Sequence, residues 1–282
     1  MQFDQIILSG SSSITLFDHR DPLSTPYVTR TVDGLGPTEA DVSLARTAQG
    51  PGIYIGRRPQ LRVITFNLNL NPNYFEGETP ETLRERIYNL RSNRPDNALV
   101  LGLYLDDVEV ANTPVYVKRV EVSPFAKDSL MQLTLESPDE YLKHPSEYAI
   151  PFVSNISRTD PIFTNIGSAP TGFLLRVSFN DIGMYSFGLI RGEQEEYLAI
   201  TNRFLTGDLL TIDTRIGSRG VWHSKNSDGL TYNLLGAMDS NSTWLQLHPG
   251  PNSFQLFQDS SVPANTNFTW SRLAYRPQYL GV

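Results

Sequence analysis

The second half of the chain constrains the fold most, because its apolar residues come in short alternating runs broken by turn residues. Runs of this kind, rich in Val, Ile, Phe and Tyr, favour strands over helices. Asp208 follows Gly207 at one break, where we expect its carboxylate to accept backbone N–H groups in a hairpin turn. The expected strands cover residues 173–179, 197–201, 209–213, 243–248, 253–257 and 268–275. Many short strands with turns between them predict a β-sandwich or a jelly roll.

The first half also reads mainly as strands. Residues 64–70 alternate between apolar and polar side chains, which predicts a strand with one buried face. Residues 18–52 are rich in Asp, Thr, Pro and Gly, and we expect a long arm or loop there, of the kind that in an assembling protein reaches a neighbour. Further strands are expected at 3–8, 14–17, 98–105, 115–122 and 130–136.

One helix is expected, directly after Thr79. This residue is a good N-cap, and Pro80 suits the first helical position. Leu83, Ile87 and Leu90 then recur on one helical face. The first half is therefore predicted to be a sheet with one helix laid across it, and the whole chain to be mainly β.

Two domains are expected, because 282 residues exceed the usual size of one hydrophobic core. Two prolines and mixed charge interrupt the apolar pattern between 137 and 150. We therefore predict an N-terminal domain of residues 1–146 and a C-terminal domain of residues 147–282.

Composition excludes several classes of protein. A net charge of −7 argues against sequence-specific or general binding of nucleic acid, since such binding depends on Lys and Arg neutralising phosphates. No cysteine is available for a disulfide or a thiolate zinc site. No apolar stretch approaches the length of a membrane helix or a secretory signal, so we expect no membrane insertion. The arginines between positions 57 and 94 are interleaved with Glu81 and Glu85, which favours ordinary ion pairs over a basic surface.

We find no catalytic, phosphate-binding or metal-binding motif in the sequence. It contains neither a phosphate-binding glycine loop nor a nucleophile elbow, and its four histidines are widely spaced. Asp208 and Asp213 flank one strand, and turn formation explains both. We therefore expect no enzyme, no catalytic residue, no metal ligand and no cofactor, and we rank a glycan hydrolase last among the possible functions.

Three tryptophans are candidates for stacking against sugar rings: Trp222, Trp244 and Trp270. Trp244 and Trp270 each stand in an alternating run, which favours packing in the core. A carbohydrate-binding or host-adsorption module is nevertheless the second hypothesis for function.

Several short motifs occur together in a fixed order. They are residues 165–171 (NIGSAPT), 207–213 (GDLLTID), 244–252 (WLQLHPGPN) and 275–279 (YRPQY), preceded by 132–141 (QLTLESPDEY). In this order they resemble the distal tail proteins of long-tailed bacteriophages. The similarity is strongest from Phe163 onward and loose before residue 57.

The resemblance implies a structural protein of the phage tail tip. A ring-forming belt domain would precede a galectin-like β-sandwich, and six copies would form a homo-hexameric ring around the DNA channel. The implied partners are the tail tube protein and the tail-tip hub protein. The implied location is the virion, after assembly in the cytoplasm of the host bacterium.

Overall fold

The computed structural model of this chain forms two compact units, one of Met1–Pro145 with Tyr279–Val282 and one of Ser146–Gln278. The last four residues, predicted to belong to the second domain, belong to the first unit. The reason is that Arg62 donates a hydrogen bond of 2.8 Å to the carbonyl oxygen of Leu280. The structure describes residues 3–10, 12–23, 25–38, 40–45, 53–90, 98–122, 129–150, 162–179, 184–191, 196–257 and 268–281, with the backbone alone at 40–45, 53–59, 184–191, 255–257 and 268–271.

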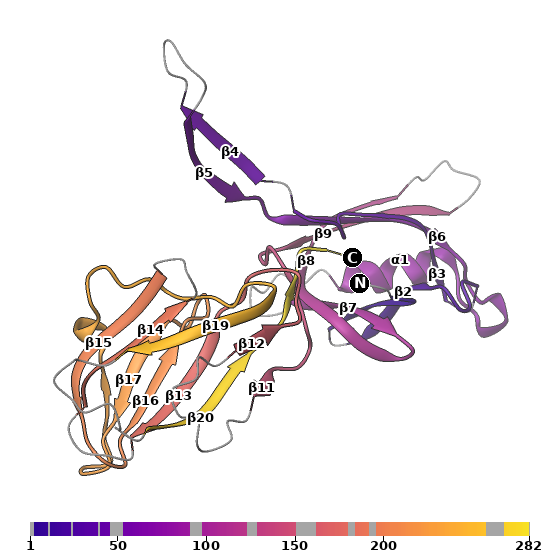
Figure 1. Cartoon of the computed structure of the whole chain (residues 1–282). Coiled ribbons are helices and arrows are strands. Elements are labelled where there is room, and N and C mark those ends of the chain that lie inside the picture. The colour runs from indigo at the N-terminus through magenta and orange to yellow at the C-terminus, as the bar shows by residue number, and fades with distance from the viewer. Residues whose placement is uncertain are drawn as a thin grey trace. The chain divides into compact units, whose positions relative to one another are not determined.

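The first unit is built on a nine-stranded sheet (Figure 1). Its main path runs β2-β1-β7-β8-β9-β6-β3, and the short strands β10 and β21 pair beside it. The strands are β1 (Gln5–Ser9), β2 (Ser13–Asp18), β3 (Tyr27–Asp33), β6 (Arg62–Leu70), β7 (Leu99–Leu105), β8 (Val108–Val122), β9 (Leu130–Ser137), β10 (Leu142–Lys143) and β21 (Gln278–Tyr279). The neighbours along the main path pair antiparallel. The Thr29 hydroxyl donates to the carbonyl oxygen of Leu16, so the two terminal strands of the path, β3 and β2, also meet.

The predicted strand at 64–70 is confirmed as the larger part of β6. Its alternating apolar residues Ile64, Phe66 and Leu68 are fully buried in the core of the first unit. Asp106 and Asp107 connect β7 to β8 with positive φ angles of 51° and 64°, which is the geometry of a tight hairpin turn.

The predicted helix is confirmed as α1 (Pro80–Asn89). The Thr79 hydroxyl accepts from the backbone N–H of Thr82 at 3.3 Å, and the Thr82 hydroxyl accepts from the backbone N–H of Thr79 at 3.0 Å. This reciprocal cap satisfies two N–H groups that a helix start otherwise leaves without a partner. Leu83 and Ile87 bury the apolar face of α1 in the core of the first unit.

The prediction of a long arm or loop at residues 18–52 is wrong for much of that range. It contains β3, which pairs with β6, and β4 (Ala40–Ala45), which pairs with β5 (Ile53–Pro59). The polar composition that suggested a loop suits strands with an exposed face, such as β3, where only Tyr27 is buried. β4 and β5 form a two-stranded sheet of their own, the β4–β5 hairpin.

The second unit is a sandwich of two antiparallel sheets (Figure 1). The six-stranded sheet has the order β11 (Tyr148–Ile150), β20 (Phe268–Tyr275), β13 (Phe173–Phe179), β16 (Leu209–Asp213), β17 (Gly220–Ser224) and β18 (Thr231–Asn233). The four-stranded sheet has the order β12 (Ile162–Asn165), β19 (Gly250–Phe257), β14 (Met184–Arg191) and β15 (Glu196–Phe204). Two 3-10 turns, η1 (Tyr74–Glu76) and η2 (Leu235–Ala237), complete the described elements of the two units.

Leu175 and Val177 of one sheet share a buried core with Ile200 and Phe254 of the other. The predicted fold class, mainly β with one helix among the described residues, is confirmed. The likeness of the second unit to a galectin stays a prediction.

One expected strand of the second unit is wrong. Residues 243–248 are extended but form no strand, because their backbone bonds to two different neighbours. Thr243 donates its N–H to the Tyr197 carbonyl at 2.8 Å, whereas Leu247 exchanges two hydrogen bonds with Thr171. Leu245 and Leu247 are still buried, as the alternation indicated.

Candidate functional site

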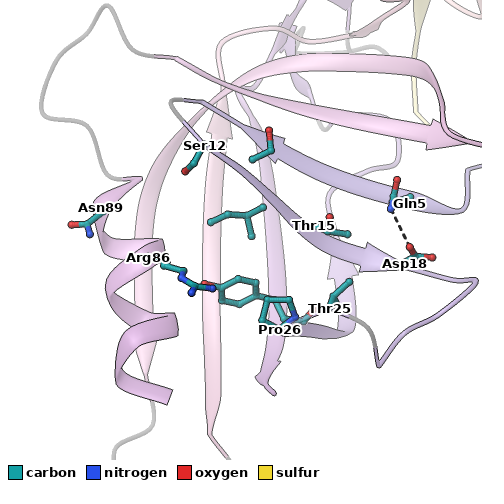
Figure 2. A pocket seen from close by; sticks show the side chains of 11 residues that line it. Gln5, Ser12, Thr15, Asp18, Thr25, Pro26, Arg86 and Asn89 are labelled. Atoms are coloured by element: carbon teal, nitrogen blue, oxygen red, sulfur yellow. Dashed lines mark hydrogen bonds between the residues drawn. The ribbon is translucent and has the colours of Figure 1, made fainter. Parts of the chain in front are cut away.

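A groove of about 670 Å³ opens in the first unit between β2, the start of β3 and α1 (Figure 2). Its lining is mixed in chemistry: Gln5, Ser12, Ser13, Ile14, Thr15, Asp18, Thr25, Pro26, Tyr27, Arg86 and Asn89. The Gln5 amide donates to Asp18 at 3.0 Å along one wall. Tyr27 also lines the groove; burial raises its pKa to about 12, so its phenol stays protonated and donates to the Leu83 carbonyl at 2.8 Å. The lining is therefore largely polar, with Ile14, Pro26 and the Tyr27 ring as its apolar members.

An exposed aromatic turn of residues 73–78 stands between β6 and α1. Phe75 is fully exposed, at 104% of its reference area, and Tyr74 is 70% exposed. The Asn73 side chain accepts from the Phe75 N–H at 3.2 Å, and Gly77 ends the turn with φ of 76°. Glu78 accepts from the Asn73 N–H at 3.1 Å and pairs with Arg86 at 2.6 Å. The backbone of this turn is thus fixed while its aromatic side chains face solvent.

The arginines between 57 and 94 do not form a basic surface among the residues whose side chains are described. Arg62 is 1% exposed, Arg84 lies 3.7 Å from Glu81, and Arg86 pairs with Glu78. The side chains of Arg57 and Arg58, and residues Arg91 and Arg94, lie outside the described part. The ion-pair interpretation is therefore confirmed for Arg84 and Arg86, whereas Arg62 has a structural role that the sequence did not indicate.

A buried polar cluster in the second unit joins Asp208, His223 and Asn202. His223 Nε2 lies 2.7 Å from Asp208 Oδ2, and its Nδ1 lies 2.9 Å from the Asn202 amide. Asp208 also accepts from the backbone N–H of Leu205 at 2.9 Å and of Asn226 at 3.0 Å. The predicted role of Asp208, a carboxylate that accepts N–H groups of a turn, is confirmed.

Opposing effects set the pKa of Asp208. Burial acts to raise it, but the N–H groups of Leu205 and Asn226 and the His223 imidazole together hold it below its usual value. An aspartate beside a histidine serves nucleophilic catalysis when the other ring nitrogen faces a hydroxyl or thiol. Here that nitrogen faces the amide of Asn202. The cluster ties the loops at the ends of β16 and β17 together.

The three candidate tryptophans do not share one site. Trp244 packs partly buried against the core of the second unit, and the Arg219 guanidinium lies 5.8 Å from its ring centre. Trp222 is on β17, where Val221 and His223 are buried and Trp222 itself is partly exposed, so it lies on the outer face of the six-stranded sheet. Trp270 is on β20 opposite Val177, and its side chain lies outside the described part.

Within the described ranges, no three His, Cys, Asp or Glu side chains gather as metal ligands. Nor does any described helix have the length and apolar content to cross a membrane.

Residues 166–278 match the family model described as the siphovirus-type tail component, C-terminal domain. Its range begins within the motif at 165–171 and ends within the one at 275–279. Among the curated proteins no sequence matches the chain.

Solved structures of phage proteins are similar to nearly the whole chain. The crystal structure of phage SPP1 Dit (gp 19.1), described as a paradigm of the hub adsorption apparatus in Gram-positive infecting phages, is 13% identical with a TM-score of 0.59. The similarity covers 97% of this chain and 98% of that one, and it shows a common fold. A chain of the phage P2 baseplate in its activated conformation with Ca has 9% identity, 99% coverage of both chains and a TM-score of 0.42.

Proposed function

We propose that six copies of this protein close into a ring at the distal end of a phage tail. The proposal starts from the family of the chain, which belongs to the siphovirus-type tail components through its domain at 166–278. The match to this family supports a structural component of a phage tail. In the proposal the ring joins the tail tube to the tail-tip hub and surrounds the DNA channel. The protein would assemble in the cytoplasm of the host bacterium and remain in the virion.

The β4–β5 hairpin is the observation that most supports the proposed ring. Among the described strands, β4 and β5 pair only with each other, so each has one edge whose backbone groups face no other strand. A two-stranded hairpin by itself is marginally stable in water, and an open edge readily pairs with another chain. Pairing with a neighbouring copy would stabilise the hairpin, and head-to-tail contacts of this kind close into rings when the rotation fits.

The aromatic turn supports the same proposal. A fully exposed Phe75 on a rigid turn is the kind of side chain that anchors an interface, because it loses little conformational freedom on binding. We assign Phe75 to a contact between copies, or between the ring and the tail tube.

The negative net charge of the chain is compatible with a channel through which DNA passes. The chain carries a net charge of −7, and a negative lumen would repel the phosphate backbone of passing DNA. A basic wall would instead hold the DNA through ion pairs.

Analytical ultracentrifugation of three variants tests the ring. The first replaces residues 40–59 by a short Gly-Ser link, which spares the nine-stranded sheet. The second is Phe75→Ser, and the control is Ile216→Ser, an exposed residue of the second unit. We expect a six-subunit species for the wild type and the control, and smaller species for the first two variants. Unchanged assembly of the hairpin variant would contradict the proposed contact.

Carbohydrate binding is a second candidate function, and one observation favours it. Trp222 presents its indole on the outer face of the six-stranded sheet instead of burying it in the core.

A further inference from the structure

Five side chains form one straight row across the outer face of the six-stranded sheet. The register pairs Arg272 with Arg176, Arg176 with Thr211, Thr211 with Trp222, and Trp222 with Asn233. Residues directly opposite each other on neighbouring strands share a face of the sheet, so all five point away from the core. The strands β20, β13, β16, β17 and β18 that carry them are consecutive in the sheet, and the first four are labelled in Figure 1. This set of residues is called the outer row.

The indole of Trp222 lies over Gly220 of the same strand. A Cβ atom added at Gly220 would lie 2.3 Å from Cη2 and 2.4 Å from Cζ2 of the Trp222 ring. The six-membered ring therefore rests on the backbone of Gly220, and only glycine leaves room for it there. Trp222 also has a competing structural role, because an aromatic ring that covers a glycine in a strand stabilises the sheet. Trp222 is only partly buried, so part of its ring is accessible to a ligand.

Two arginines occupy neighbouring positions in the same row. Arg176 and Arg272 are exposed and directly opposite each other, and like charges in this position destabilise a sheet. Glu147 compensates Arg272 at 3.4 Å, but Arg176 has no hydrogen-bond or ion-pair partner among the described residues. An anionic group bound between them would remove the repulsion.

The polar members of the row add directional hydrogen bonds. The Asn233 side-chain oxygen accepts from the Leu235 N–H at 2.9 Å, so the amide is held in one orientation with its own N–H groups available as donors. Thr211 stands between Arg176 and Trp222 and offers a hydroxyl. Neighbouring strands lie about 4.8 Å apart, so Arg176 is about 10 Å from Trp222 along the row.

We propose that the outer row binds an oligosaccharide that carries acid groups. One sugar ring stacks on Trp222, its hydroxyls bond to Thr211 and Asn233, and a carboxylate or phosphate of the same chain pairs with Arg176 and Arg272. This inference rests on the second candidate function and does not need the ring.

A single-stranded nucleic acid also combines stacking with negative charge, and the surroundings of the row disfavour it. Such binding uses a positively charged groove and successive aromatic platforms. The outer row has one tryptophan, Glu147 pairs with Arg272 at 3.4 Å, and Arg215 lies 3.5 Å from Glu147 and 2.6 Å from Asp213. These carboxylates can accept hydrogen bonds from sugar hydroxyls, which the backbone of a DNA strand does not offer along its length.

Titration calorimetry on the full chain tests the site with four probes. They are an oligogalacturonate, a neutral oligogalactan of equal length, the same oligogalactan carrying a phosphate group and a single-stranded DNA oligonucleotide. We expect an acid-bearing probe of the first or third kind to bind at least about tenfold more tightly than the oligogalactan, since charge-assisted bonds contribute most of the affinity. Whichever of the two binds identifies the acid group as carboxylate or phosphate.

Variants separate binding from folding. Arg176→Gln should weaken binding about tenfold without lowering the melting temperature, because the side chain has no partner to lose and its removal relieves the repulsion with Arg272. Trp222→Phe keeps a ring over Gly220 but should abolish the change of indole fluorescence on binding. Arg276→Gln, which removes the same charge from an exposed position of the second unit outside the row, should bind as the wild type does.

Three other results would each contradict the inference for a different reason. If the neutral oligogalactan binds as tightly as the acid-bearing probes, and Trp222→Phe abolishes that binding, the carbohydrate function would stand but the ligand would not need acid groups. Tighter binding of DNA would make the row a nucleic-acid site. Binding of no probe would remove the carbohydrate function as well.

Discussion

Arg62 donates a hydrogen bond of 2.8 Å to the carbonyl oxygen of Leu280, 218 residues further along the chain. The same guanidinium donates to the carbonyl oxygens of Gly34, Gly36 and Glu140 at 2.7–3.0 Å. Burial lowers the pKa of Arg62, yet a guanidinium remains charged in proteins. One buried charge therefore joins three separate segments of the first unit, including the end of the chain.

Arg62→Met should lower the free energy of unfolding of the first unit by about 3 kcal/mol, because four carbonyl groups lose a charged, buried donor. Urea unfolding followed by circular dichroism measures the change. Arg30→Met, at an exposed position of β3, is the control and should have a much smaller effect. A loss equal to that of the control would show that Arg62 does not hold the segments together.

Gly281→Ala should destabilise the first unit by about 1–3 kcal/mol, because the added methyl group has no room. Its Cβ would lie 2.6 Å from the carbonyl carbon of Gly36 and 2.7 Å from the Leu35 oxygen. Gly36→Ala is a matched control, since its Cβ would meet nothing within 4 Å. Thermal unfolding compares the two variants, and equal melting temperatures would contradict the close approach of these two segments.

Asp208→Asn should lower stability by about 2 kcal/mol at pH 7, because the charged acceptor of several hydrogen bonds is lost. The pKa of Asp208 is depressed in the folded state, so its contribution is full above the unfolded value of about 4 and is lost as the pH falls through the folded value. Urea unfolding at pH 7 and at pH 3 should therefore show a smaller difference between wild type and variant at the lower pH. A difference that stays constant or grows on acidification would rule out a stabilising role for the ionised Asp208 carboxylate.

Residues 146–278 should fold alone, because this unit has its own core between two sheets. Expressed by itself, the fragment should give a β-type circular dichroism spectrum and one cooperative thermal transition. The full chain supplies the reference for the spectrum. An insoluble or unfolded fragment would count against the division of the chain.

Local signals explain which elements could be predicted from the sequence. The cap of α1 and the alternation in β6, β13, β16 and β20 depend on residues that are close in sequence. β17 was not predicted, because Gly220 and Trp222 do not suggest a strand until the sheet on either side is known. β3 was not predicted either, since its buried partner β6 lies about thirty residues away and compensates its polar composition.

The candidate sites follow the same division. Asp208 was recognisable as a turn residue, but its partner His223 comes close only through the pairing of β16 with β17. The outer row depends on the register of five strands, and its arginines lie far from Trp222 in the sequence. Arg62 was placed with the surface arginines because its carbonyl partners come from three distant segments, which no local pattern reveals.

Native mass spectrometry of the purified full chain, alone and mixed with tail tubes, decides whether the protein forms a six-membered ring. We expect a species of six chains in at least one of the two samples, and electron microscopy of that species should show a closed ring with an inner surface poor in Lys and Arg. A protein that stays monomeric in both samples, or a ring whose lumen is lined mainly by Lys and Arg, would contradict it.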